Sequence, residues 1–175
     1  MIRKLVVVLL ALAVAGPLWA RGGPRFVVGD GLLGYVSTEV QPTVKCVGGV
    51  PTGYPHCSSG TRRIITRGEV QTWTAIGVSA GIAEFLDGPL TFHINCNFNA
   101  DYRGPCWGTF SWDVPDMGTW EGHVFAPVMD LNTYESELVM FGFGDGGDLD
   151  GKTLKLEGSS DPGDWYIAFT ARIGR

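Results

Sequence analysis

The sequence has little positive charge. Only 13 of its 175 residues are Lys or Arg, against 18 Asp or Glu, so the formal net charge is −5 at pH 7. An acidic surface repels the phosphate backbone of nucleic acids and the headgroups of anionic lipids. We therefore expect no nucleic-acid partner.

Long apolar runs are absent beyond the N-terminus. The run over residues 5–15 follows Arg3 and Lys4 and leads to Leu18-Trp19-Ala20, a pattern typical of a secretory signal peptide. The run is shorter than the roughly 20 residues that a transmembrane helix needs. We predict a signal peptide over 1–20, with Ala13-Val14-Ala15 as an alternative cleavage motif. A single domain over 21–175 would then be secreted or periplasmic, without membrane insertion.

Cysteines are few. The chain has four, and after an export signal they favour disulfides over metal binding, with free buried thiols as the alternative. Three pairings are possible. We predict Cys46–Cys57 and Cys96–Cys106, each of which closes a local loop of about ten residues.

Helical periodicity is also lacking, whereas glycine (26 residues) and tryptophan (6 residues) are plentiful. Seven or eight short segments alternate apolar and polar residues with period two, which is typical of half-buried antiparallel strands. The prediction is an all-β, disulfide-stapled antiparallel barrel of about eight strands. A β-sandwich or jelly roll is the alternative.

Residues 90–126 predict a strand followed by a hairpin with a defined register. If Cys96 opposes Cys106, the apolar residues of the two strands face each other, as Ile94 with Gly108, Phe92 with Phe110 and Leu90 with Trp112. A slip of one residue would break every one of these pairs. After the turn, a five-residue connection over either 114–118 or 115–119 keeps Trp120 on the same face and puts Gly122 opposite an aromatic ring.

Aromatic residues gather on the predicted inner face. They are Phe92, Phe110, Trp112, Trp120 and Phe141. Packing of the core is the ordinary role of such residues, but an eight-stranded barrel can also hold one small ligand, so these five are the candidate contacts for a small apolar ligand. Trp73, Trp107 and Phe125 fall on the opposite face of their strands. They could form an external platform that stacks on sugar rings.

Polar candidates for catalysis or metal binding are weak. Ser79 lies in a G-x-S-x-G pattern but lacks the strand–helix context of a nucleophile elbow. Ser111, Asp113, Glu121 and His123 share one face of the hairpin, which we interpret as its solvated face. Asp145, Asp148 and Asp150 could bind calcium weakly, but an acidic Gly-rich turn is also an ordinary β connection. No metal site and no cofactor is expected.

Residues 108–158 resemble the allene-oxide-cyclase-like barrel superfamily. The matching pieces are Gly108-Thr109 with Trp112, Gly118-Thr-Trp-Glu-Gly122, and Gly144-Asp-Gly-Gly-Asp-Leu-Asp-Gly151 leading into Leu154. The resemblance implies an eight-stranded antiparallel barrel that holds an apolar ligand. The plant cyclases of that group close a fatty-acid epoxide with polar groups that have no counterpart here, so the activity stays open.

Three functions follow from these patterns. The first is a non-enzymatic exported barrel that binds a small apolar ligand or serves an interaction role. The others are a carbohydrate-binding module that uses exposed Trp, and an isomerase or cyclase that acts inside the barrel. An inward Glu or His beside an empty cavity would favour the enzyme, and a flat row of exposed Trp would favour the carbohydrate module. The oligomeric state is left open.

Overall fold

A computed structural model describes residues 26–175, so the predicted signal peptide and its cleavage site lie outside the described residues. Nine strands and two short 3-10 helices make up this part of the chain. They are β1 (Val27–Val40), β2 (Thr43–Val47), β3 (Arg63–Ile76), η2 (Ala83–Phe85), β4 (Pro89–Asn99), β5 (Arg103–Val114), β6 (Gly118–Asp130), β7 (Ser136–Asp145), η3 (Gly147–Leu149), β8 (Thr153–Ser160) and β9 (Tyr166–Gly174).

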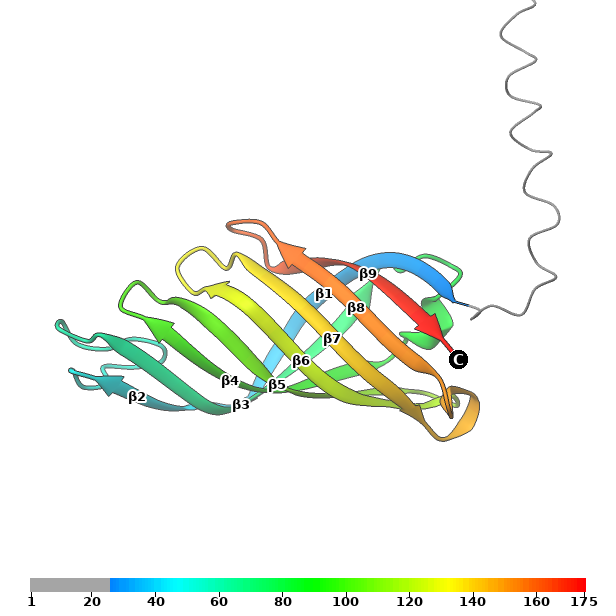
Figure 1. Ribbon diagram of the computed structural model, residues 1–175, viewed down its shortest axis with the longest axis horizontal. Helices are drawn as coiled ribbons and strands as arrows, with labels where there is room; N and C mark the ends of the chain where they lie inside the picture. The colour runs from blue at the N-terminus through cyan, green and yellow to red at the C-terminus, as the bar shows by residue number, and fades with distance from the viewer. Residues whose placement is uncertain (1–25) are drawn as a thin grey trace, which may run out of the picture.

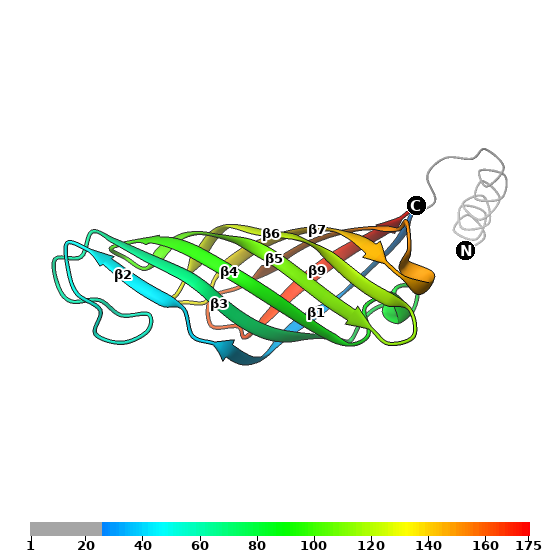
Figure 2. The same ribbon diagram turned by 90° about the horizontal axis from the view of Figure 1, so that it is seen from below.

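The strands form a closed antiparallel barrel (Figure 1). Each strand from β3 to β9 pairs with its neighbour in sequence, and β1 closes the barrel by pairing with both β9 and β3. Strand β2, which the sequence analysis did not predict, is a ninth strand added to the end of β3. Figure 2 shows β2 and its loop at one end of the elongated barrel, and η2 at the other. The predicted fold is confirmed.

The predicted register between β4 and β5 is also confirmed. Cys96 faces Cys106, Phe92 faces Phe110 and Leu90 faces Trp112. Both predicted disulfides are present, Cys46–Cys57 and Cys96–Cys106. The second joins two residues that the strand ladder already places opposite each other, so the bond and the hydrophobic pattern specify the same register.

The turn between β5 and β6 adopts the first of the two predicted registers. Trp112 faces Trp120 and Phe110 faces Gly122. Gly122 in turn faces Gly142 of β7. A Cβ added at Gly142 would lie 2.6 Å from the tip of the Phe110 ring, so that ring occupies the space left by the glycine.

One end of the barrel is plugged. The Trp112 and Trp120 side chains are fully buried, and their indole N–H groups donate to the carbonyls of Gly88 (3.2 Å) and Phe85 (2.8 Å). Both acceptors belong to the segment around η2, which packs Ile82, Leu86 and other apolar side chains into the barrel end. A buried tryptophan needs such a partner for its N–H, so the two indoles attach the plug as well as filling the core.

A β-bulge in β3 reverses the expected direction of Trp73. Thr66 pairs with Cys96, whereas Glu69 pairs with Ile94, so β3 contributes one residue more than β4 between these pairs. Gly68 lies within the bulge at a φ of +73°. Because an extra residue inverts the in–out alternation, Glu69, Gln71 and Trp73 point inward after it. The prediction of Trp73 on an external platform is wrong.

Candidate functional site

The half of the barrel beyond the plug encloses a cavity of about 330 Å³. This volume is at the lower end of the roughly 300–1,000 Å³ that is usual for ligand pockets. Apolar side chains from four strands, β4, β6, β7 and β9, form much of its wall, namely Phe92, Ile94, Phe98, Val124, Ala126, Leu138 and Ile167. The rim comes from the loops that follow β2, β6 and β8 and includes Tyr54, Leu131 and Trp165.

A chain of four polar side chains crosses one side of this apolar cavity. Glu69 is only 3% exposed. The Tyr54 hydroxyl donates to its Oε2 (2.8 Å), and the Gln71 amide donates to its Oε1 (2.7 Å). The indole N–H of Trp73 donates to the Gln71 side-chain carbonyl (2.9 Å). All four residues line the cavity, so the chain presents a buried carboxylate at its wall.

Tyr54 acts as a hydrogen-bond donor in this chain. Burial raises the pKa of the Tyr54 phenol above its ordinary value, and the neighbouring Glu69 carboxylate raises it further by a smaller amount. Both effects disfavour the charged phenolate. The phenol therefore keeps its proton at neutral pH. The Tyr54 side chain is also 39% exposed, and so it lies between solvent at the rim and the buried carboxylate.

The loop between β2 and β3, residues 48–62, holds Tyr54 in place; we call it the stapled loop because a disulfide ties it to β2. The Cys46–Cys57 disulfide links β2 to this loop. The amide N–H of Cys57 donates to the Tyr102 hydroxyl (3.3 Å), and the His56 ring contacts the Tyr102 ring edge-on at 5.8 Å. The sequence predicted this disulfide. The contribution of this loop to a cavity appears only in the fold.

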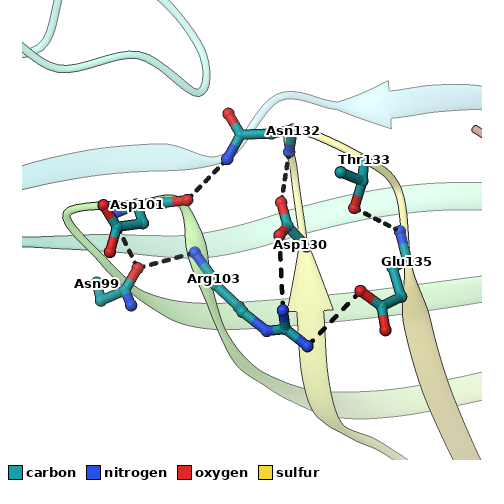
Figure 3. Close-up of polar contacts among 7 residues, drawn as sticks. All are labelled: Asn99, Asp101, Arg103, Asp130, Asn132, Thr133 and Glu135. Atoms are coloured by element: carbon teal, nitrogen blue, oxygen red, sulfur yellow. Dashed lines mark hydrogen bonds and ion pairs between the residues drawn. The ribbon is translucent and has the colours of Figure 1, made fainter. Parts of the chain in front are cut away.

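A second polar network joins the β4–β5 loop to the β6–β7 loop (Figure 3). The Arg103 guanidinium lies 4.0 Å from the Asp130 carboxylate and 3.6 Å from that of Glu135. The Asn132 amide donates to the Asp101 carbonyl (2.7 Å). The Arg103 side chain is 48% exposed, and exposed ion pairs contribute no more than about 1 kcal/mol. This network therefore positions two loops, and it adds little stability.

The aromatic residues predicted as ligand contacts fall into three groups. Phe92 is buried and lines the cavity. Phe110, Trp112 and Trp120 are buried as predicted, but they pack in the main core and not along the cavity wall. Phe141 is 53% exposed, beneath Lys155, so its placement on the inner face is wrong. Strand β7 is apolar on both faces, which is why alternation could not distinguish inside from outside.

The remaining residues of the predicted sugar platform lie on the outer wall. Trp107 and Phe125 face each other across β5 and β6. The Arg67 guanidinium lies 4.9 Å from the centre of the Trp107 ring and covers it. With Trp73 inside the barrel and Trp107 covered, these residues do not form a flat row of exposed Trp.

The polar candidates lie outside the cavity. Asp113, Glu121 and His123 are exposed on the outer face of the hairpin, as predicted. The Ser79 hydroxyl hydrogen-bonds the Asp30 carboxylate and accepts from the Asp30 N–H (3.1 Å), which ties the loop after β3 to β1.

Over residues 26–175, no three His, Cys, Asp or Glu side chains converge as metal ligands would, and Asp145, Asp148 and Asp150 are separately exposed. Within the same range, no helix is long and apolar enough to cross a membrane.

Sequence reasoning missed Glu69 and Tyr54. A signal for Glu69 was available, because a glycine inside a strand often marks a bulge and Gly68 directly precedes it. After the bulge, Glu69, Gln71 and Trp73 lie on the same face of the strand. If the Trp73 side chain is buried, the Glu69 side chain is therefore buried as well. Tyr54 had no such signal, since its loop has no periodicity.

Fold and site together define a closed eight-stranded antiparallel barrel, plugged at one end, with a largely apolar cavity and one buried carboxylate at the other. Comparison of the chain with protein-family models, curated proteins and solved structures finds no match. The resemblance to the allene-oxide-cyclase-like superfamily therefore stays a prediction.

Proposed function

We propose that this chain is an exported protein that binds one small, mostly apolar ligand inside its barrel. The observation that carries the proposal is the cavity of about 330 Å³, whose walls are largely apolar and carry a hydrogen-bonded polar chain on one side. Binding sites for small molecules combine these two features, because the apolar wall supplies affinity and a few polar groups fix orientation. The N-terminal segment and the two disulfides support export.

Filling the cavity tests this function. Ala126 is buried on the cavity wall, and Ala126→Phe is expected to weaken binding of the neutral dye N-phenyl-1-naphthylamine at least tenfold. Leu131→Trp, at the half-buried rim, is a second blocking variant in case the first does not fold. Dye fluorescence gives the dissociation constant, and circular dichroism checks the fold.

Ala168→Phe is the matched control, because Ala168 is exposed on β9 and the substitution should leave dye binding unchanged. Equal dye binding by the wild type, both blocking variants and the control would place binding outside the cavity. Failure of the wild type to bind would remove the proposal.

A second candidate is an isomerase or cyclase that acts in the same cavity. The Glu69 carboxylate beside an apolar cavity favours it, because Glu69 could move a proton while the Tyr54 hydroxyl, 2.8 Å away, donates to developing negative charge. We expect Glu69→Gln to slow rearrangement of a neutral unsaturated epoxide about 100-fold or more, as followed by NMR, while dye binding persists. If the wild type binds the dye but does not convert the epoxide, the enzymatic role is refuted and only the binding role stands.

A further inference from the structure

Both carboxyl oxygens of the buried Glu69 side chain have hydrogen-bond donors. Each carboxylate oxygen accepts one hydrogen bond, from Tyr54 to Oε2 and from Gln71 to Oε1. An ionised carboxylate only accepts hydrogen bonds and has about four acceptor positions. The two donors therefore leave further acceptor capacity on a group that lines the cavity.

No basic side chain of the described chain neutralises this carboxylate. The ion pairs within residues 26–175 involve Arg103 and Lys155, and neither contacts Glu69. Arg67, two residues away in sequence, donates instead to the carbonyls of Thr66 and Cys96 and to the Asn97 side chain. Buried charges in proteins are normally paired, and so Glu69 lacks the usual partner.

The rest of the cavity has the same electrostatic character. Among residues 26–175, its other acidic lining residue is Asp164, its one imidazole is His56, and neither Lys nor Arg lines it. A ligand carboxylate placed here would meet like charge in a site partly shielded from water, where such repulsion is strong. A protonated amine would supply the missing countercharge and make charge-assisted hydrogen bonds.

We propose that the cavity selects apolar ligands that carry a protonated amine, with the ammonium group against Glu69 and the apolar body along the wall of Phe92, Ile94 and Val124. This inference rests on the proposed binding function and narrows its ligand class. It also implies that simple fatty acids are poor ligands, although their chains would suit the wall.

Three probes with equal chains test the inference: 1-octylamine, 1-octanol and octanoate. Each displaces N-phenyl-1-naphthylamine from the full-length mature protein at pH 7.5, where an alkylamine is protonated. We expect octylamine to bind at least tenfold more tightly than octanol, and octanoate to bind most weakly. Because screening weakens surface attraction far more than buried attraction, the preference should persist in 0.5 M NaCl.

Glu69→Gln assigns the preference to one side chain. In this variant octylamine and octanol should bind within about threefold of each other, whereas Glu121→Gln, on the exposed outer face, should behave as the wild type does. The salt series on the wild type tests the proposal even if Glu69→Gln does not fold. Octanol or octanoate binding as tightly as octylamine, or a preference lost in salt, would overturn the amine proposal while dye binding still supports the cavity.

Discussion

Trp120→Ala is expected to lower the free energy of unfolding by about 3–5 kcal/mol, the range for truncating a large buried aromatic residue. Trp120 is fully buried, and its indole donates to Phe85 in the plug. The variant loses the packing of the ring and also leaves the Phe85 carbonyl without this donor. Urea denaturation, followed by circular dichroism, measures the loss.

Two further variants separate these contributions. Trp120→Phe keeps most of the ring but removes the donor, so an intermediate loss is expected, which includes about 1 kcal/mol for the hydrogen bond. Trp165→Ala is the control, because that side chain is 59% exposed at the opposite rim and its removal should cost less than about 1 kcal/mol. If Trp120→Ala cost no more than Trp165→Ala, the plug would not be a principal part of the core.

Removal of the Cys46–Cys57 disulfide by a double change to alanine is expected to cost roughly 2–3 kcal/mol, as loop entropy predicts for a closure of this size. It should also weaken binding of octylamine, since the bond ties down the loop that brings Tyr54 to Glu69. Urea denaturation gives the first quantity and dye displacement gives the second.

Tyr54→Phe is the matched comparison for the disulfide variant. It keeps the staple and removes only the hydroxyl, so its stability should stay above that of the disulfide variant. Retention of wild-type octylamine affinity in the disulfide variant would show that the loop keeps its place through the contacts of Cys57 and His56 with Tyr102 alone.

The interior of the barrel is filled with side chains in one half and hollow in the other. An eight-stranded barrel has room either for side chains or for one small ligand, and in this chain one half is packed while the other leaves a cavity. The plugged half contains both fully buried tryptophans, and the other half holds the cavity. Substitutions in the plug should therefore change unfolding far more than the dye dissociation constant, and substitutions of the polar chain should do the reverse.

The sequence by itself determined the barrel class, the two disulfides and the register between residues 90–96 and 106–112. These features depend on local information, because alternation with period two assigns opposite faces and a one-residue slip would expose every apolar side chain. The same alternation placed Gly122 opposite an aromatic residue in either of two registers, and the structure selects Phe110 as that residue. Where one face was clearly apolar and the other polar, the pattern was sufficient.

Only the tertiary structure decided which side of β3 and β7 faces inward, and where the cavity lies. Strand β7 is apolar on both sides, and the bulge at Gly68 inverts the alternation of β3, so parity counted along the chain could not place Phe141 or Trp73. The Glu69–Tyr54 contact joins a bulged strand to an aperiodic loop. Such a contact depends on the path of a stapled loop through space, which no local pattern encodes.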